Sequence, residues 1–235
     1  MSIQLSKEAE KYVYYKEYDP DIIVMLGDCL EIMPLLEKVD LIVTDPPYGI
    51  GDFVKTGDAN IYKQRSDKRV GTADWNKTIP SVECFKTIKE ISKDQIIWGA
   101  NYFNCFNPDG GCLVWDKNNE SSQRYSNCEI ASISTQKRVS IFRFTWNGML
   151  QQHMDDKEFR YHPTQKPTVV MKWAIQQYKY WNTPISILDP FLGSGTTLVA
   201  CKELKRNGNG IGIEINERYC HIAKKRLKNT QVPFL

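Results

Sequence analysis

A carboxylate, two prolines and a tyrosine stand just after a short aliphatic run. Residues 41–43 are aliphatic, and Asp45-Pro46-Pro47-Tyr48 follows one residue later. Proline fixes its own φ and holds the preceding residue extended, so this stretch is predicted to be a stiff exit from a strand. Pro46 has a carbonyl but no N–H, so it and the Asp45 carboxylate can offer two acceptors to one ligand. Tyr48 adds a flat ring for stacking.

Two fixed acceptors beside an aromatic ring suit a planar heterocycle that carries an exocyclic amine. Such an amine is a poor nucleophile because its lone pair is delocalised into the ring. Acceptors on both N–H groups favour a pyramidal nitrogen and stabilise the positive charge that grows on it during attack. What is left for the protein to do is to place the amine against an electrophilic carbon. A merely rigid turn is disfavoured by the position of the four residues after an apolar strand.

A glycine-rich turn follows a second apolar run. Asp189 ends that run, Gly193 and Gly195 let the backbone approach a ligand closely, and Thr196 begins a helix whose free N–H groups favour an anion. The spacing is neither GxGxxG nor GxxxxGKS, which disfavours dinucleotide and P-loop functions. Glu214 ends the next apolar run, where an acid can bind both hydroxyls of a ribose. The two features together predict a nucleoside-bearing cofactor.

The elements that position these residues are predicted from the alternation of apolar runs and amphipathic segments. Seven runs rich in Ile, Val, Phe and Trp are predicted strands, at 21–28, 39–49, 94–103, 111–117, 138–148, 185–195 and 209–216. Five segments have helical periodicity, at 29–38, 81–92, 168–181, 196–206 and 217–228. Strands that alternate with helices predict a mostly parallel sheet covered on both faces. Polar segments that fit no element lie at 52–75, 118–127 and 149–163, and such long loops are often functional.

Composition bounds the class of protein. A chain of 235 residues suits one α/β domain, and its net charge of +3 is compatible with a polyanionic partner. The seven cysteines include no CxxC, which predicts reduced thiols and neither a disulfide framework nor a metal site. No apolar run is long enough to cross a bilayer, and the N-terminus has no signal-peptide core. We therefore expect a cytoplasmic protein without membrane association or metal.

The motifs resemble the signature blocks of S-adenosylmethionine-dependent DNA amino-methyltransferases. The matching blocks are Asp45–Tyr48, 162–167, 189–197 and 212–216, with secondary blocks at 27–33, 96–103, 112–117 and 144–148. The catalytic block precedes the cofactor block, which is the order of the β group. The resemblance implies a Rossmann-like, doubly wound, seven-stranded mixed sheet with six parallel strands, one antiparallel strand at 138–148 and helices on both faces. It places the cofactor strand (185–189) beside the catalytic strand (40–44), within a single methyltransferase domain spanning residues 1–235.

The resemblance also assigns roles to residues. The residues implied to hold a flipped-out base are Asp45, Pro46, Pro47 and Tyr48. Those implied to bind S-adenosylmethionine are Asp28, Thr164, Lys166, Asp189, Phe191, Gly193, Ser194, Gly195, Thr196 and Glu214. Among them, Asp28 is expected at the cofactor's adenine amine and Glu214 at its ribose, with Thr164 and Lys166 at its carboxylate.

The expected partner is double-stranded DNA. Basic side chains in two of the long loops are candidates for phosphate contacts, although each could equally be a solvated charge: Lys63, Arg65, Lys68, Arg69 and Arg124. The basic run 224–228 is expected to be a solvated face of the last helix. Only Met149–Tyr161 separates the two blocks between which relatives usually carry a target-recognition segment. Recognition of the DNA target sequence would then depend on loops 52–75 and 118–127 or on a second subunit of a homodimer. Otherwise the recognised site would be short and permissive.

The resemblance implies a site-specific DNA methyltransferase that acts on the N6 amine of adenine, as in restriction–modification systems. Asp in the first place of the catalytic block usually accompanies adenine, whereas N4-cytosine enzymes more often have Ser there. Cytosine N4 is the first alternative. Methylation of RNA or of a glutamine amide is another, and a non-catalytic DNA-binding module that keeps the fold is the alternative from a different class.

Overall fold

The computed structural model describes residues 3–18, 21–49, 79–119, 126–147, 150–155, 157–161, 164–204 and 209–231. Its strands are β1 (Val13–Glu17), β2 (Ile22–Leu26), β3 (Val39–Thr44), β4 (Ser92–Trp98), β5 (Gly111–Asp116), β6 (Cys128–Ile133), β7 (Val139–Arg143), β8 (Trp146–Asn147), β9 (Leu150–Gln151), β10 (Ser186–Asp189) and β11 (Asn209–Glu214). Its helices are α1 (Lys7–Glu10), α2 (Cys29–Ile32), the 3₁₀ turn η1 (Met33–Leu35), α5 (Val82–Glu90), α6 (Ala100–Phe103), α7 (Thr168–Gln176), α8 (Thr196–Glu203) and α9 (Glu217–Asn229).

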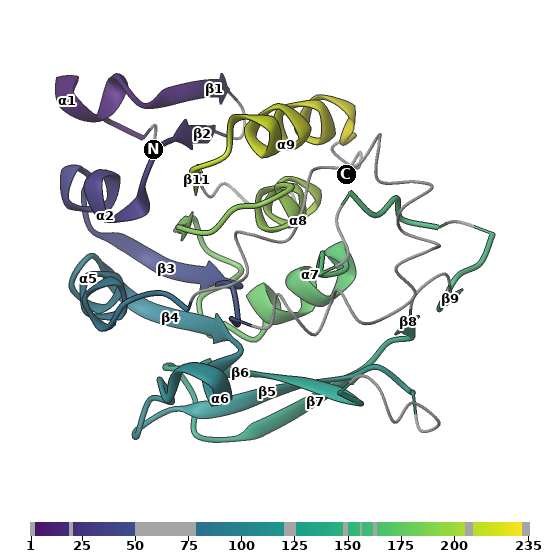
Figure 1. The fold of residues 1–235 in the computed structure, drawn as a ribbon. Coiled ribbons are helices and arrows are strands. Elements are labelled where there is room, and N and C mark those ends of the chain that lie inside the picture. Colours follow the sequence, from purple (N-terminus) through teal and green to yellow (C-terminus); the bar gives the residue numbers. More distant parts are fainter. Residues whose placement is uncertain are drawn as a thin grey trace.

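The main sheet is mixed and has nine strands in the described ranges, in the order β1-β2-β11-β10-β3-β4-β6-β5-β7 (Figure 1). Only β1 and β6 of these strands run against the others. The predicted α/β class and mixed sheet are confirmed, but the predicted seven strands are wrong. The predicted antiparallel strand is wrong too, because β7 pairs in parallel with β5 and the inner antiparallel strand is β6.

Helices cover both faces of the sheet, because its central strands are apolar on both sides. In β3, Leu41 and Val43 pack in one core cluster with α7 and α8, whereas Ile42 packs in another with α2 and α5 (Figure 1). This alternation is what successive residues of a strand produce. Helix α9 joins α8 on the first face, over β2. A strand buried on both faces reads as a continuous apolar run, which is why these strands were predictable.

The chain winds in opposite directions from β3 and β10, which lie side by side in the sheet. From β3 it passes through α5 to β4, and from β10 it passes through α8 to β11 on the other side. Leu188 of β10 pairs with Ile42 of β3, so the expected adjacency of the cofactor and catalytic strands is confirmed. In a doubly wound sheet, ligands bind beyond the carboxyl ends of strands at such a switch point.

Two further expectations concern surfaces. None of the helices in the described ranges is long and apolar enough to cross a membrane. The residues predicted to contact DNA phosphates (Lys63, Arg65, Lys68, Arg69 and Arg124) lie outside the described residues.

Candidate active site

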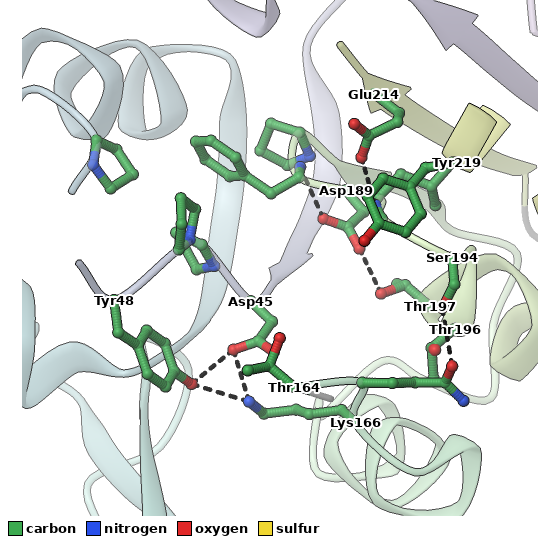
Figure 2. A pocket seen from close by; sticks show the side chains of 18 of the residues that line it. Asp45, Tyr48, Thr164, Lys166, Asp189, Ser194, Thr196, Thr197, Glu214 and Tyr219 are labelled. Carbon is green, nitrogen blue, oxygen red and sulfur yellow. Dashed lines mark hydrogen bonds and ion pairs between the residues drawn. The ribbon is translucent and has the colours of Figure 1, made fainter. Parts of the chain in front are cut away.

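A cavity of about 600 Å³ opens at the carboxyl ends of the central strands. It is lined by every residue predicted for the base or the cofactor except Gly195. Figure 2 shows Asp45 and Tyr48 on one side and the glycine turn with Glu214 on the other. The stiff exit of β3 and the glycine turn therefore face one shared space.

Asp189 ties the two strands of the switch point together. Thr44, the last residue of β3, donates to Asp189 Oδ1 at 2.7 Å, and the Phe191 N–H donates to the same oxygen at 3.0 Å. Thr197 of α8 donates to Oδ2. Burial raises the pKa of Asp189 to about 6, although these hydrogen bonds oppose the change. The carboxylate thus fixes the start of the turn relative to the catalytic strand.

The glycine turn is held against Glu214. The Gly193 N–H donates to Glu214 Oε2 and the Asn216 N–H to Oε1, each at 2.8 Å. Burial raises the pKa of Glu214. Gly193 (φ 54°) lines the cavity, whereas Gly195 (φ 90°) does not. A Cβ on Gly195 would lie 2.8 Å from the Ala223 Cβ, so this glycine serves the packing of α9, and its predicted role in ligand approach stays a prediction.

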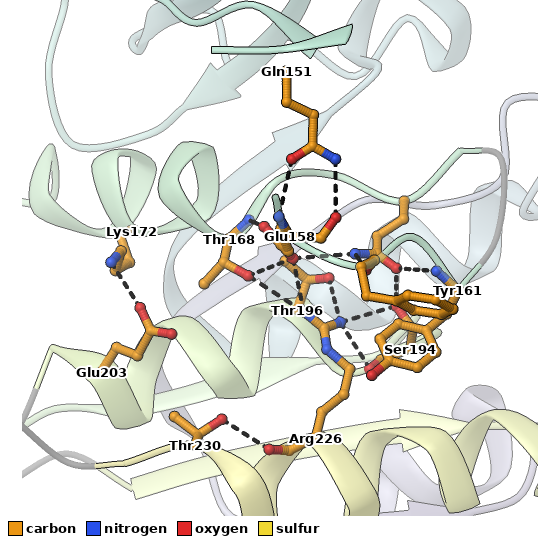
Figure 3. A network of polar contacts seen from close by, with 12 residues as sticks. Gln151, Glu158, Tyr161, Thr168, Lys172, Ser194, Thr196, Glu203, Arg226 and Thr230 are labelled. Atoms are coloured by element: carbon orange, nitrogen blue, oxygen red, sulfur yellow. Dashed lines mark hydrogen bonds and ion pairs between the residues drawn. The ribbon is translucent and has the colours of Figure 1, made fainter. Parts of the chain in front are cut away.

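Arg226 of α9 supports the same turn from below (Figure 3). Its Nη1 donates to the Ser194 carbonyl at 3.0 Å, to Ser194 Oγ at 3.1 Å and to Thr196 Oγ1 at 3.0 Å. Its Nη2 pairs with Glu158 Oε1 at 2.9 Å. Burial lowers the pKa of Arg226, and Glu158 opposes the shift. Arg226 is 8% exposed, so the expectation of a wholly solvated basic face on α9 is wrong at this position.

Glu158 and Gln165 attach the segment 157–161 to the glycine turn and to α7. Glu158 accepts from the Thr168 N–H at 2.8 Å and from Thr168 Oγ1 at 2.7 Å. The Gln165 amide contacts Ser194 Oγ at 3.2 Å and accepts from the Tyr161 N–H at 2.9 Å. The short segment between the two sequence blocks is therefore anchored to the predicted cofactor site.

Lys166 lies with the predicted catalytic acid and not with the glycine turn (Figure 2). Its ammonium donates to Asp45 Oδ1 at 2.6 Å, to Tyr48 Oη at 2.8 Å and to Glu129 Oε2 at 2.8 Å. The Tyr48 hydroxyl also donates to Asp45 Oδ1 at 2.6 Å. Glu129 of β6 is bound in turn by Lys117, at 2.7 Å. Neither Glu129 nor Lys117 was predicted, because a strand at β6 was not recognised.

The charges of this group shift one another. Burial raises the pKa of Asp45, and Lys166 partly offsets the effect. Burial would also raise the pKa of Glu129, but Lys166 and Lys117 outweigh it and lower that pKa to about 2. Burial would lower the pKa of Lys166, but Asp45 and Glu129 raise it. At neutral pH, Lys166 is therefore a buried cation beside the Glu129 carboxylate.

Tyr48 is seated by residues of the β4–α6 corner. Its ring stacks on Tyr102, with centroids 4.7 Å apart and planes 19° apart. A Cβ on Gly99 would lie 2.2 Å from the Tyr48 ring, so a side chain at Gly99 would displace it. One face of the Tyr48 ring is thus covered by protein.

Two buried donors in the wall of the cavity have no hydrogen-bond partner in the described part of the chain. They are Trp146 Nε1 and Asn119 Nδ2, and both residues line the cavity. Trp146 is 5% exposed and Asn119 is 8% exposed. Leaving a buried donor unpaired costs about 1–3 kcal/mol, so these groups are suited to the acceptors of a bound ligand. On the other side, Asp28 caps α2 by accepting from the Leu30 N–H at 2.8 Å.

A family model described as DNA methylase (N6_N4_Mtase) matches residues 86–225, more than half of the chain. The chain is 27% identical over 245 residues to the type II methyltransferase M.HpaI of Haemophilus parainfluenzae, covering 87% of this chain and 73% of that protein. It is 26% identical over 253 residues to M.HinfI of Haemophilus influenzae, covering 87% and 68%.

Two solved structures share the fold. The M1.HpyAVI–SAM complex has a TM-score of 0.51 at 24% identity and covers 88% of this chain and 98% of that one. PvuII DNA methyltransferase, described as cytosine-N4-specific, has a TM-score of 0.57 at 12% identity and covers 94% and 92%. At these identities the likeness concerns the fold alone.

Proposed function

Because this chain belongs to the DNA methylase family, we propose that it transfers a methyl group from S-adenosylmethionine to the N6 amine of an adenine rotated out of double-stranded DNA. The observation that carries the proposal is the shared cavity. Asp45 and Pro46, at the end of β3, face the same space as the glycine turn at the end of β10. A methyl acceptor bound by the first group and a methyl donor bound by the second would meet there.

The residues around the glycine turn suit the cofactor. The volume of about 600 Å³ is within the range of roughly 300–1,000 Å³ typical of small-molecule sites. Glu214 is positioned by two backbone N–H groups and is available to the two ribose hydroxyls. Gly193 keeps the wall of the turn free of side chain, and Asp28 and Thr164 supply polar groups to the same cavity. The cofactor supplies an electrophilic methyl group when bound.

The chain's own residues prepare the amine. Within the described part of the chain, Lys166 and Tyr48 both contact the Asp45 carboxylate at Oδ1, and Oδ2 is the oxygen proposed to accept from the amine. The Pro46 carbonyl is the second acceptor, since proline has no competing N–H at this point of the chain. Acceptors that are fixed before the reaction stabilise the positive charge developing on nitrogen at no reorganisation cost. The Tyr48 ring lines the same cavity and is a candidate for stacking on the ring of the base.

The geometry suits any base with an amine next to a ring nitrogen acceptor, as in adenine and cytosine. Asp in the first place of the catalytic block supports adenine, and N4 of cytosine is the alternative. A target amine inside a duplex is unreachable, so the base must be flipped out at a cost of a few kcal/mol. The predicted phosphate contacts of Lys63, Arg65, Lys68, Arg69 and Arg124 would contribute to meeting that cost.

Nucleoside analysis of treated DNA tests this function. The purified chain is incubated with S-adenosylmethionine carrying a deuterated methyl group and with unmethylated genomic DNA, and the digested nucleosides are analysed by mass spectrometry. We expect labelled N6-methyldeoxyadenosine. Labelled N4-methyldeoxycytidine would establish the alternative, and label in RNA or in protein but not in DNA would overturn the proposal.

Asp45→Ala is the matched inactive variant. It removes the acceptor for the amine but leaves the glycine turn and Glu214 in place, so we expect methyl transfer to be abolished and the affinity for S-adenosylmethionine to persist. Loss of cofactor binding in this variant would mean that Asp45 belongs to the cofactor site. Cofactor and DNA binding by the unaltered chain without turnover would identify a non-catalytic module.

A further inference from the structure

The buried ammonium of Lys166 is fully occupied by groups of the target side of the cavity. An ammonium has three N–H donors, and those of Lys166 meet Asp45, Tyr48 and Glu129 at 2.6, 2.8 and 2.8 Å. Its side chain is 4% exposed. The resemblance places Lys166 at the carboxylate of the cofactor, but each of its donors is directed elsewhere.

Glu129 is fixed by the sheet itself. It lies on β6 directly opposite Trp115 of β5, and Lys117, just beyond β5, contacts its second oxygen, Oε1, at 2.7 Å. Glu129 therefore binds Lys166 through Oε2 and is restrained through Oε1. A strand side chain whose two oxygens are each held by a lysine is a rigid support, since little rotamer freedom is left to lose on substrate binding.

We propose that Lys166 and Glu129 are positioning residues of methyl transfer, which hold the Asp45 carboxylate by Oδ1 so that Oδ2 is presented to the amine. This inference rests on the proposed function. Lys166 favours the ionised form of Asp45, which burial opposes, and Glu129 balances the charge of Lys166. The balance matters because an uncompensated cation beside the amine would repel the positive charge that grows on its nitrogen.

Two substitutions separate this role from cofactor binding. Lys166→Met is expected to slow single-turnover methyl transfer by about 10²-fold, as when one oriented donor is removed from a reacting centre. Glu129→Gln, which keeps the shape and one acceptor, is expected to slow it about tenfold. The dissociation constant of S-adenosylmethionine, measured by calorimetry, should change less than about threefold in both. A rise of tenfold or more in Lys166→Met would assign Lys166 to the cofactor carboxylate and overturn the proposal.

Lys172→Met is the matched control. Lys172 also forms an ion pair at 2.7 Å, with Glu203, but it joins α7 to α8 and does not line the cavity. The proposal predicts that this variant keeps the transfer rate. A loss as large as that of Lys166→Met would show that any broken ion pair lowers activity and would overturn the specific role.

The pH dependence of the methyl-transfer rate distinguishes this role from a merely structural one, which would leave it unchanged. The charged and titratable groups facing Asp45 are Lys166, Glu129, Tyr48 and Asp189. Lys166 lowers the pKa of Asp45 and Glu129 raises it. Without Lys166 the acidic limb of the rate profile should therefore move to higher pH, and without the charge of Glu129 it should move to lower pH. Shifts in the same direction, or none, would refute the proposal.

A titration without turnover keeps the inference separate from the proposed function. The carboxyl carbon of Asp45, assigned by comparison with Asp45→Asn, is followed by NMR in the unaltered chain and in both variants. Shifts of the Asp45 titration in opposite directions, with no methylation of DNA, would overturn the proposed function but would still show that Lys166 and Glu129 act on Asp45. Methylation of DNA with an unchanged Asp45 titration would overturn the pair's role alone. In the double variant Lys166→Met/Glu129→Gln, which removes one positive and one negative charge and so keeps the net charge of the group, the titration should lie between those of the single variants.

Discussion

Glu214 is the single residue on which the predicted ribose contact depends. Both of its oxygens accept backbone hydrogen bonds at 2.8 Å, so its orientation is set before any ligand arrives. We expect Glu214→Ala to raise the dissociation constant of S-adenosylmethionine by roughly ten- to a hundredfold, as for the loss of a hydrogen bond to a charged group. Calorimetric titration measures this.

Glu217→Ala is the control for that variant, because Glu217 is exposed in the first turn of α9 and does not line the cavity. It should bind the cofactor as the unaltered chain does. An unchanged dissociation constant in Glu214→Ala would contradict the ribose assignment.

At the residue scale, sequence reasoning found the groups whose neighbours along the chain define them. Asp45 is stiffened by the prolines that follow it, and Gly193 lies in a local turn. It missed Glu129 and the true partners of Lys166, because those partners are 37 and 121 positions apart along the chain from Lys166. An ion pair between residues that are distant along the chain forms only when the fold brings them together, so no local sequence pattern predicts it.

At the scale of elements, Gly195 determines how closely α9 packs on the glycine turn. Its φ is 90°, and an added Cβ would lie 2.8 Å from Ala223. We expect Gly195→Ala to lower the free energy of unfolding by about 2–3 kcal/mol, the sum of overpacking and left-handed strain. Urea denaturation measures the loss.

Gly49→Ala separates the two causes. Gly49 also has a positive φ of 73° but is exposed, so it should lose only the strain of about 1 kcal/mol. Equal losses in the two variants would mean that the contact with α9 contributes nothing.

Asp189 joins β3, β10 and α8, and its ionisation makes that junction depend on pH. Burial raises its pKa to about 6 in the folded protein, from about 3.9 in an unfolded chain. The folded state therefore binds this proton more tightly than the unfolded chain does, and the contribution of Asp189 to stability falls as pH rises from about 4 to 6. The loss amounts to roughly 3 kcal/mol.

Asp189→Asn lacks this titration. We expect the free energy of unfolding of the variant, relative to that of the unaltered chain, to rise by up to about 3 kcal/mol between pH 4 and pH 6. Urea denaturation of both proteins at four pH values measures the difference. A difference that stays constant over this range would refute the assignment.

The central strands were predicted from continuous apolar runs, and β7 was predicted from its Val, Ile and Phe although it is partly exposed. The apolar runs that became β2 and β3 are almost entirely buried. The two strands of the main sheet that were missed are of another kind: β1 (VYYKE) is half-buried throughout, and β6 (CEIASI) is half-buried over its first half. A half-buried strand carries polar residues on one side, so it lacks the continuous apolar signal, and the strand count fell short by these two.

At the scale of the whole molecule, Arg226 connects the C-terminal helix to parts of the chain that are far apart in sequence. It contacts Ser194 and Thr196 in and after the glycine turn, and Glu158 in the segment before α7 (Figure 3). We expect Arg226→Met to lower the free energy of unfolding by about 3 kcal/mol, because the oxygens of Ser194 and Thr196 would lose a buried donor and the half-buried Glu158 would lose its cation. Urea denaturation measures this.

Lys225→Met is the matched control, since Lys225 is the exposed neighbour of Arg226 on α9 and should change stability by no more than about 0.5 kcal/mol. The double variant Arg226→Met/Glu158→Gln should lose less than the sum of its single variants, because it leaves no lone charge. Additive losses would indicate that the pair is not coupled.

The walls of the cavity include two indoles, Trp115 and Trp146, and both are almost fully buried. Indole emission is sensitive to the polarity and the charges around the ring. Entry of a ligand would change the surroundings of these two side chains more than those of Trp173 and Trp181 on the α7 side. Occupancy of the site therefore has an optical signal of its own, so binding could be followed by intrinsic fluorescence in stopped flow, without a radiolabel or a dye.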